Sequence, residues 1–304
     1  MGLKISKYEK GLISAIITTY KRPVSVLNRA IRSVLNQTYS DIELIVINDS
    51  PDYEKRVEID KLIQNYKITY HINEQTKGAN YSRNYGITLS HGEFLAFLDD
   101  DDEWLSNKIE VMIEGFTNNK VGLVYCDIIL NSNGKDSILQ MAEYPDNEVI
   151  KNLLDHNYIG GFSGPIIRRE VLNRSGMLDE NLLSSQDSDL WRRLALKSNL
   201  YHVNQPLIRY YISKKSISSD FNNRLKGTLA LIQKFDYLYE KYPEVRKRHI
   251  SRSVLNFMRA GWFKGAFLLY TSVYSSPRDI LLNIYTIPLG LVKRIIKIIT
   301  HNYD

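Results

Sequence analysis

Cysteine is nearly absent from this chain, which has 304 residues and a single cysteine, Cys126. One thiol excludes a disulfide framework within the chain and fits a reducing compartment. Residues 1–10 mix charged and polar side chains and lack the apolar core of a signal peptide. We therefore predict a cytoplasmic protein.

A glycine-rich phosphate-binding loop is missing as well. The first apolar run, Leu12–Thr19, is followed by Tyr20-Lys21-Arg22-Pro23, and Arg22 stands where P-loop proteins and nicotinamide enzymes carry glycines. This difference argues against both classes. The six histidines form no cluster with metal-ligand spacing, so the sequence does not indicate a histidine-based metal centre.

The sequence also lacks an uninterrupted apolar run long enough to span a membrane. Leu281–Thr300 comes nearest, but Pro288 interrupts it and Lys293, Arg294 and Lys297 fall inside it. These three charges share one helical face opposite an apolar face, which is typical of a helix in the membrane interface. A helix that packs on its own chain or on a second subunit would show the same pattern.

Charge is distributed unevenly along the sequence. Residues 214–304 carry 16 Lys and Arg against 6 Asp and Glu, a net charge of +10, whereas residues 1–213 carry 24 against 28, a net charge of −4. A basic tail suits an anionic membrane surface or nucleic acid. Because the acidic body argues against a non-catalytic nucleic-acid-binding protein, we predict peripheral contact with the inner face of the cell membrane and no nucleic-acid partner.

Short apolar runs alternate with helical patterns through the first 127 residues. The predicted strands are Leu12–Thr19, Ile42–Ile47, Ile68–Ile72, Glu93–Leu98 and Val121–Asp127, and the predicted helices are Val24–Gln37, Asp52–Tyr66, Ala79–Ser90 and Glu103–Asn118. This alternation predicts an α/β fold in which helices cover both faces of a mostly parallel, Rossmann-like sheet.

The alternation weakens after Asp127. The later predicted elements are a hairpin over Ile128–Met141, a helix over Asn147–Leu154, a flexible loop at Gly160–Pro165, an amphipathic helix that continues to about Lys197, a returning strand over Tyr201–Tyr211, and helices over Phe221–Tyr242, Glu244–Tyr270 and Asp279–Thr300. The last three helices form a C-terminal extension beyond the sheet.

Polar segments lie at the ends of predicted strands or in the loops that follow them. They are Thr18–Arg22, Asn48-Asp49, Lys77-Gly78 and Asp99–Asp102. Because ligands bind outside the carboxyl ends of the strands in open parallel sheets, we expect these segments to converge at one edge. That edge then combines one basic segment, one lone acid and one acidic cluster.

The acidic cluster consists of four consecutive aspartates, Asp99–Asp102. Adjacent carboxylates repel one another, so a cation should compensate them, and Mg²⁺ and Mn²⁺ prefer oxygen ligands of this kind. A solvated turn that caps the next helix would also explain an acidic run. A sugar-phosphate nucleotidyltransferase could use a similar sheet and acidic metal site, which leaves that class as an alternative.

Five sequence motifs occur in the order found in one enzyme family. They are residues 16–23 (IITTYKRP), 33–39 (SVLNQTY) with 43–49 (ELIVIND), 77–80 (KGAN) with 82–86 (SRNYG), 92–93 (GE) with 97–102 (FLDDDD), and 186–191 (QDSDLW). With these motifs, the stretch from about residue 12 to residue 213 resembles glycosyltransferase family 2, whose inverting enzymes have a catalytic domain of the GT-A fold. The resemblance implies metal-dependent transfer of a hexose, with inversion, from a nucleotide-diphosphate donor such as a UDP-sugar. The implied acceptor is a hydroxyl of a glycan or lipid-linked oligosaccharide in surface polysaccharide synthesis.

The resemblance also divides the chain into domains. Residues 1–213 would form the GT-A catalytic domain, with a nucleotide-sugar half at about 12–127 and an acceptor half at about 128–213. Residues 214–304 would form a helical, basic and amphipathic extension. Homo-oligomer formation through these tail helices remains open.

Roles in nucleotide-sugar binding are implied position by position. The residues concerned are Thr18, Thr19, Tyr20, Arg22, Asp49, Lys77, Arg83, Asp99 and Asp100. In this set Asp49 would accept hydrogen bonds from the base, and Lys77 and Arg83 would contact the diphosphate or the base. A strand-end turn would also explain Asp49, and a solvated helix charge would explain Lys77.

The acidic run matches the Asp-x-Asp element of the family. The resemblance implies that Asp101 binds Mn²⁺ or Mg²⁺ directly and that Asp99 reaches the metal or the ribose. Because four aspartates leave the register open by one residue, Asp102 could share or replace Asp101.

The catalytic base of the family is matched by Asp187, which would remove the proton of the acceptor hydroxyl. Asp189 is the alternative base. Gln186 stands where the family usually has a glutamate, which leaves a second carboxylate function at this position open. Gly161, in the flexible loop, is expected to line the acceptor side.

Overall fold

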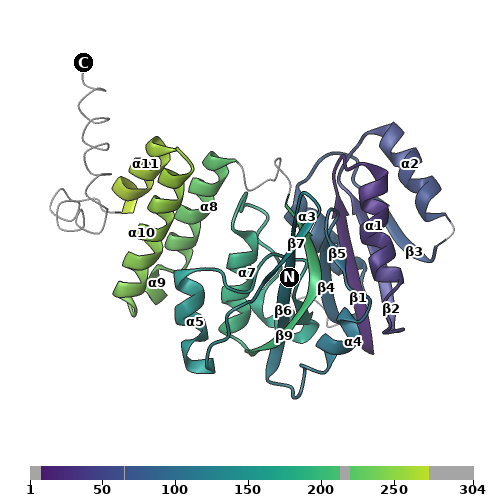
Figure 1. Cartoon of the computed structure of the whole chain (residues 1–304), viewed down its shortest axis with the longest axis horizontal. Helices are drawn as coiled ribbons and strands as arrows, with labels where there is room; N and C mark the ends of the chain where they lie inside the picture. The colour runs from purple at the N-terminus through teal and green to yellow at the C-terminus, as the bar shows by residue number, and fades with distance from the viewer. Residues whose placement is uncertain (1–7, 65, 213–219, 274–304) are drawn as a thin grey trace. The chain divides into compact units, whose positions relative to one another are not determined.

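The computed structural model describes residues 8–64, 66–212 and 220–273 (Figure 1). The chain divides into two compact units. Unit 1 consists of Met1–Ile150, Asn157–Asn181 and Gln186–Lys214, and unit 2 consists of Lys151–His156, Leu182–Ser185 and Lys215–Asp304. The principal boundary follows residue 214, and two short segments from the first part of the sequence belong to unit 2.

Four parallel strands form one half of the sheet in unit 1. They are β1 (Glu9–Thr19), β2 (Ile42–Asn48), β3 (Ile68–Ile72) and β4 (Gly92–Asp99). The order is β3-β2-β1-β4, so β1 lies between β2 and β4. Continuous apolar and β-branched runs favour β1, β2 and β4, whose residues are mostly buried, whereas β3 at the sheet edge is only partly buried.

The other half of the sheet is mixed. The order continues β4-β8-β6-β9-β5, with β7 paired to the side of β6. The strands are β5 (Glu103–Trp104), β6 (Val121–Ser132), β7 (Lys135–Leu139), β8 (Ile166–Arg168) and β9 (Asn199–Tyr211). The long β6 and β9 are parallel, whereas β8 runs antiparallel to both β4 and β6. The predicted hairpin and returning strand are therefore present, and most of the paired residues lie in parallel ladders.

Helices cover both faces of this sheet. On one face α1 (Val24–Leu35), α2 (Tyr53–Ile63) and α4 (Lys108–Ile113) contribute buried apolar side chains to a core that also contains Ile13, Ala15 and Ile17 of β1. On the other face α3 (Ala79–Leu89) approaches β1 so closely that a Cβ at Gly86 would lie 2.6 Å from Cγ2 of Ile16. The predicted α/β fold class is confirmed.

The remaining helices of the sheet region follow β7 and β8. They are α5 (Asp146–Asp155), whose last residues belong to unit 2, α6 (Arg169–Ser175) and α7 (Gln186–Ala195). The ring of Trp191 on α7 packs against Phe162, whose ring in turn meets the edge of Phe97 on β4. This aromatic chain joins the start of α7 to the sheet beside the acidic run.

The predicted helix over Glu103–Asn118 is wrong at its beginning and its end. Glu103 and Trp104 form β5 instead, because they pair with Arg209 and Ile208 of β9. The Trp104 backbone N–H also donates to Ser33 Oγ, and its indole N–H donates to the carbonyl of Ser163. These distant partners hold the segment extended, and the helix α4 is confined to Lys108–Ile113.

Unit 2 contains four helices among its described residues. They are α8 (Phe221–Lys234), α9 (Asp236–Tyr239), α10 (Pro243–Arg259) and α11 (Phe263–Val273). Each of the first two predicted tail helices is thus divided, the second of them at Gly261, which adopts a φ of +79°. The third, over Asp279–Thr300, lies outside the described residues.

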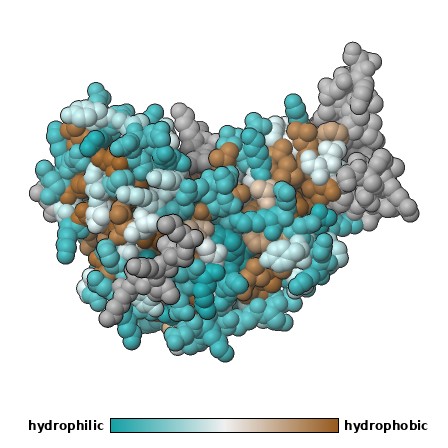
Figure 2. All heavy atoms as spheres, turned by 180° about the vertical axis from the view of Figure 1, so that it is seen from behind, coloured by the Kyte–Doolittle hydropathy of each residue, from teal (hydrophilic) through white to brown (hydrophobic). Residues whose placement is uncertain are grey.

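The helices of unit 2 have an interior of their own. Phe257 and Trp262 meet edge to face, and the Tyr239 hydroxyl donates to the carbonyl of Leu154. Figure 2 shows apolar side chains that reach the surface over these helices, and Leu268 of α11 is 39% exposed. Within the described part of the chain, no helix is long and apolar enough to cross a membrane.

Candidate active site

The four aspartates at the end of β4 point alternately inward and outward. Asp100 and Asp102 are buried, with 6% and 1% of their surface exposed. The side chains of Asp99 and Asp101 are 33% and 28% exposed. The run is therefore not a uniform acidic patch. It forms a turn after β4, in which the Asp102 backbone N–H donates to the Asp99 carbonyl at 3.1 Å, and this turn directs the four side chains differently.

The inward pair makes internal hydrogen bonds. Asp100 accepts from Thr19 Oγ1 at 2.7 Å and from Arg22 Nε at 2.8 Å, and burial raises the pKa of its carboxyl to about 6. Asp102 accepts from Ser163 Oγ at 2.5 Å and from the Tyr211 backbone N–H at 3.3 Å. Burial and the neighbouring Asp99 raise the pKa of Asp102 well above its ordinary value.

The outward pair is neutralised by two arginines. Arg83 donates to Asp99 at 2.7 Å, and Arg22 contacts Asp101 at 2.8 Å while it also holds Asp100. Both guanidinium groups thus lie directly beside the exposed carboxylates. Arginine also binds phosphate oxygens through its paired N–H groups, so this edge combines two features suited to a diphosphate.

A divalent cation fits Asp99 and Asp101 better than the inward pair. In the described part of the chain, no three His, Cys, Asp or Glu side chains are grouped closely enough to hold a metal alone. Two exposed carboxylates are nevertheless sufficient for Mg²⁺ or Mn²⁺ when substrate phosphates complete the coordination. Asp102 is committed to Ser163 and the Tyr211 backbone, which disfavours it as a replacement for Asp101.

Asp49 follows β2 directly, and its carboxylate accepts hydrogen bonds from the loop that contains Lys77 and Gly78. Its Oδ1 accepts from Asn73 Nδ2 at 2.7 Å and from the Lys77 backbone N–H at 2.8 Å, and its Oδ2 accepts from the Gly78 N–H at 2.8 Å. Gly78 has a φ of +95°, which a residue with a side chain rarely adopts. Asp49 and the Lys77-Gly78 loop therefore meet at the sheet edge.

The end of β1 brings further predicted residues to this edge. Thr18 lies between Ile47 of β2 and Asp99 of β4 in the strand register. Tyr20 is 49% exposed, and Lys21 beside it has a φ of +53°. The Lys21 ammonium lies 5.3 Å from the centroid of the Tyr20 ring.

The predicted residues Lys77 and Arg83 differ in their surroundings. The Lys77 ammonium is near the ring of Tyr81, 5.7 Å from its centroid, at an exposed position. Arg83 is buried and stacks on Phe162 at 4.0 Å, and it also donates to Gln186 Oε1 at 3.4 Å. Arg83 thus bridges the acidic run and the first residue of α7.

The predicted base, Asp187, lies in the first turn of α7. Its Oδ1 accepts from the Ser188 backbone N–H at 2.7 Å, and its Oδ2 accepts from Asn157 Nδ2 at 3.0 Å. Burial raises the pKa of Asp187, the hydrogen bond from Ser188 and the charge of Arg83 lower it, and the charge of Asp99 raises it. The electrostatic coupling to Asp99 and Arg83 associates this carboxylate with the acidic run.

The two other predicted positions near α7 have different surroundings. Asp189 is fully buried and forms an ion pair with Arg193 at 2.9 Å, which favours a structural role over that of a base. Gly161 has open space where a Cβ would lie, so this part of the loop could accept a neighbouring group.

Tyr210 on β9 was not among the predicted site residues. Burial and the charges of four carboxylates, those of Asp102, Asp99, Asp101 and Asp187, raise the pKa of its hydroxyl. The residue as a whole is 37% exposed. The sequence places Tyr210 in a predicted strand but gives no signal that selects it from the neighbouring tyrosines.

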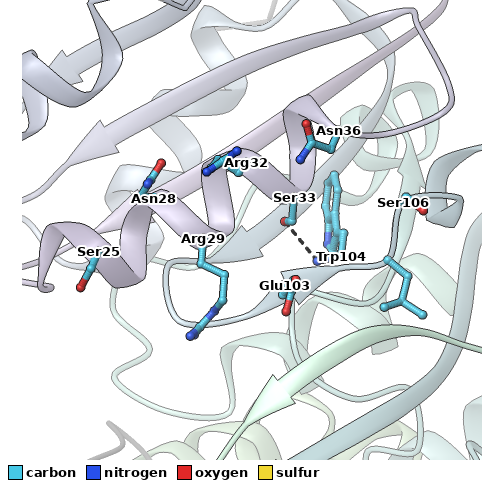
Figure 3. Close-up of a pocket in the computed structure, with 10 residues that line it drawn as sticks. Ser25, Asn28, Arg29, Arg32, Ser33, Asn36, Glu103, Trp104 and Ser106 are labelled. Carbon is cyan, nitrogen blue, oxygen red and sulfur yellow. Dashed lines mark hydrogen bonds between the residues drawn. The ribbon is translucent and has the colours of Figure 1, made fainter.

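A cavity of about 490 Å³ lies on the α1 side of the acidic turn (Figure 3). Arg29 and Arg32 of α1 line it together with Glu103 and Trp104 of β5. Arg29 donates to the carbonyl oxygen of Asp101, so the cavity borders the acidic turn. It contains none of the side chains predicted for the site.

The comparison with protein families decides the class of this chain. Residues 14–176 match the model described as glycosyl transferase family 2. The chain belongs to this family. Family 2 membership makes the protein a glycosyltransferase.

The chain is also similar to curated proteins that are named as glycosyltransferases. The chain is 30% identical over 229 residues to the Escherichia coli protein WfgD, named as a UDP-Glc:alpha-D-GlcNAc-diphosphoundecaprenol beta-1,3-glucosyltransferase, covering 71% of this chain and 83% of the relative. It is 26% identical over 257 residues to TuaG of Bacillus subtilis, a putative teichuronic acid biosynthesis glycosyltransferase, covering 83% of this chain and 93% of the relative.

Solved structures show the same fold at low sequence identity. TarS residues 1–349 of S. aureus, in complex with UDP-GlcNAc, match 87% of this chain and 92% of that chain with a TM-score of 0.59 and 14% identity. The mannosyltransferase PcManGT of Pyrobaculum calidifontis, in complex with GDP-Man and Mn²⁺, matches 95% and 83% with a TM-score of 0.60 and 13% identity. These likenesses confirm the GT-A fold for the family 2 domain.

Proposed function

We propose that the protein transfers a hexose, with inversion and metal dependence, from a UDP-sugar to a hydroxyl of a glycan or lipid-linked oligosaccharide in surface polysaccharide synthesis. One observation carries this proposal. The exposed carboxylates Asp99 and Asp101 each pair with an arginine, and Arg83, the partner of Asp99, also donates to Gln186, the residue before Asp187. A sugar diphosphate and an acceptor hydroxyl need these groups close together.

The chain's own residues supply binding, orientation and a base. Arg22 and Arg83 suit the diphosphate, and Asp49 with the Lys77-Gly78 loop suits the nucleoside end. Asp187 would take the proton of the acceptor hydroxyl as that oxygen attacks the anomeric carbon opposite the diphosphate, and a single displacement of this kind inverts the configuration.

Asp99 and Asp101 would hold Mn²⁺ or Mg²⁺. When bound, the ion would stabilise the negative charge on the departing nucleoside diphosphate. The Mn²⁺ in the complex of PcManGT, a structural neighbour, supports this part of the proposal.

The relatives support a particular donor and acceptor. The name of WfgD specifies a UDP-sugar donor and a diphosphate-linked lipid acceptor, and TarS binds UDP-GlcNAc. The basic tail of this chain, with its net charge of +10, would suit an enzyme that meets a lipid-linked acceptor at an anionic membrane surface. We assign the protein to the inner face of the cell membrane on these grounds.

Calorimetric titration with UDP, GDP, CDP and dTDP, each with and without Mn²⁺, tests the donor class. We expect UDP to bind with metal dependence and Asp101→Asn to weaken that binding at least tenfold. Asp136→Asn, a substitution of an exposed aspartate on β7, is the matched control and should leave binding unchanged. Binding of no diphosphate would overturn the proposed function.

Analysis of the reaction products tests the chemistry. A transferase releases UDP, and Asp187→Asn should reduce that release by a factor of about 10² to 10⁴ while UDP binding persists. Release of pyrophosphate would instead indicate a nucleotidyltransferase.

A further inference from the structure

Asn157 makes four hydrogen bonds with its side chain at the start of the 157–163 loop. Its Oδ1 accepts from the backbone N–H groups of Ile159 at 3.0 Å and Gly160 at 3.2 Å. Its Nδ2 donates to the carbonyl of Gly160 at 3.0 Å and to Asp187 Oδ2 at 3.0 Å. The oxygen of the amide thus shapes the loop, whereas the nitrogen also reaches the candidate base.

The loop that Asn157 shapes is anchored at further points. The Trp191 indole N–H donates to the Gly160 carbonyl at 2.9 Å. Ser163, at the other end of the loop, donates to Asp102 and accepts from the Asp99 backbone N–H at 3.1 Å. A side chain fixed on this loop therefore has a defined position relative to both α7 and the acidic run.

Asp187 has two oxygens with different partners. Oδ1 is held by the backbone of its own helix through Ser188, at 2.7 Å. Asn157 is the donor from outside α7 that fixes the direction of Oδ2. A neutral amide donor orients a carboxylate and leaves its second lone pair available, and it favours the ionised form that a base needs.

We propose that Asn157 is a positioning residue for the transfer reaction, holding the Asp187 carboxylate ionised and aimed at the acceptor hydroxyl. This inference rests on the proposed function, in which Asp187 is the base. Asn157 itself does not touch the reacting atoms; it acts through Asp187.

Asn157→Asp removes the donor to Asp187 and keeps part of the shaping of the loop. The bond from Nδ2 to the Gly160 carbonyl is lost as well, but the Trp191 indole N–H still donates to that carbonyl. Aspartate keeps an Oδ1 that can accept from Ile159 and Gly160, so the loop retains both acceptor bonds. It replaces the Nδ2 donor with a second carboxylate oxygen that faces Asp187. Two such carboxylates share one proton, and Asp187 becomes a free base only after that proton leaves at higher pH.

The first test compares pH profiles of UDP release. We expect the acid limb of kcat for Asn157→Asp to move upward by about one pH unit or more, with kcat near pH 7 reduced at least tenfold. The Kd for UDP with Mn²⁺ should remain unchanged, because Asn157 contacts the proposed catalytic base, Asp187, and does not contact the predicted nucleotide pocket. If Asn157 had only a structural role, Asn157→Asp would lower kcat at every pH without moving the acid limb of the pH profile.

Asn118→Asp is the matched control. Asn118 is an exposed loop residue of the same unit, and its Oδ1 likewise accepts a backbone N–H, that of Lys120, at 2.8 Å. This variant adds the same charge and should reproduce the wild-type profile. An acid limb for Asn157→Asp that coincides with those of the wild type and Asn118→Asp would refute the inference.

A second measurement does not depend on catalysis. In the exchanged variant Asn157→Asp with Asp187→Asn, the amide and the carboxylate trade places and the hydrogen bond can form in the opposite direction. We expect Asn157→Asp to lower the Tm at pH 8 and the exchanged variant to recover most of that loss. No recovery would show that the two side chains are uncoupled.

The two readouts also separate this inference from the proposed function. If the wild type releases UDP but the limb does not move, the role of Asn157 is wrong and the proposed transfer stands. If the wild type releases no UDP with any acceptor, the proposed function is wrong, and the exchange experiment alone reports whether Asn157 and Asp187 are paired.

Discussion

Tyr210 offers a hydroxyl in the middle of an acidic site. Its raised pKa keeps it protonated, so it can donate a hydrogen bond to a phosphate or sugar oxygen. We expect Tyr210→Phe to lower kcat/KM for the sugar donor about tenfold, the value of one lost hydrogen bond to a charged group. Steady-state kinetics with the donor varied would measure it.

A suitable control for this substitution lies on the same strand. Tyr201 is also exposed on β9, nine residues before Tyr210 and paired with Val124 of β6. Tyr201→Phe should leave kcat/KM unchanged. Equal effects of the two substitutions would show that Tyr210 has no particular contact with the donor.

At the level of single residues, the sequence predicted the composition of the site better than its geometry. Four adjacent aspartates indicated a metal site, but the residues that could bind the ion depended on which side chains turn outward. That direction is set by Thr19, Ser163 and the Tyr211 backbone, which hold Asp100 and Asp102 inside. Partners so distant in sequence leave no local pattern, and the proposed roles of the aspartates remain predictions.

The short helix α4 contains a buried charge. Lys108 is fully buried, and its ammonium lies 4.3 Å from the centroid of the Trp104 ring. Within the described residues its Nζ has no hydrogen-bond partner. Burial lowers the pKa of Lys108 from 10.5 to about 8, a shift equivalent to about 3 kcal/mol against folding.

This lowered pKa gives the stability a defined dependence on pH. Between about pH 8 and 10.5 the unfolded chain binds the proton more tightly than the folded chain, so the free energy of unfolding rises with pH. Below pH 8 the buried charge of Lys108 destabilises the folded state by its full amount. We expect Lys108→Met to increase the free energy of unfolding by about 1–3 kcal/mol near pH 7, since the contact with Trp104 offsets part of the penalty.

Denaturant unfolding of the two proteins at several pH values would measure this effect. The advantage of Lys108→Met should shrink as the pH rises above 8. Lys120→Met, at an exposed position, is the control for loss of one positive charge. An advantage that is absent near pH 7, or that does not change with pH, would contradict the prediction.

At the level of elements, continuous apolar runs predicted the strands β1, β2 and β4 because most of their residues are buried, and the short β-rich run of β3 was recognised although it lies at the sheet edge and is only partly buried. Apolar periodicity failed at Glu103–Trp104, where the helical pattern competes with pairing to β9, about 105 residues later in the chain. It also merged α8 with α9 and α10 with α11, because a turn such as that at Gly261 interrupts the backbone without changing the apolar pattern.

At the scale of the whole molecule, the tail predicts where the enzyme works. We expect the full chain to co-sediment with vesicles that contain anionic lipid and to be released at high salt, because the attraction is largely electrostatic. A chain that ends at Ile280 should remain in the supernatant. Equal partitioning of the two proteins would contradict this prediction, and a change in apparent mass on truncation would favour association between tails.

The strand order has a consequence for the protein during its synthesis. The parallel strands β3-β2-β1-β4 are complete once residue 99 has been added, but β8, the partner on the free side of β4, begins only at Ile166. Arg169, which bonds to Ser14 and Ser90, arrives after that. A nascent chain on the ribosome therefore carries an open, apolar strand edge while residues 100–165 are still being translated, the interval in which a chaperone would matter most.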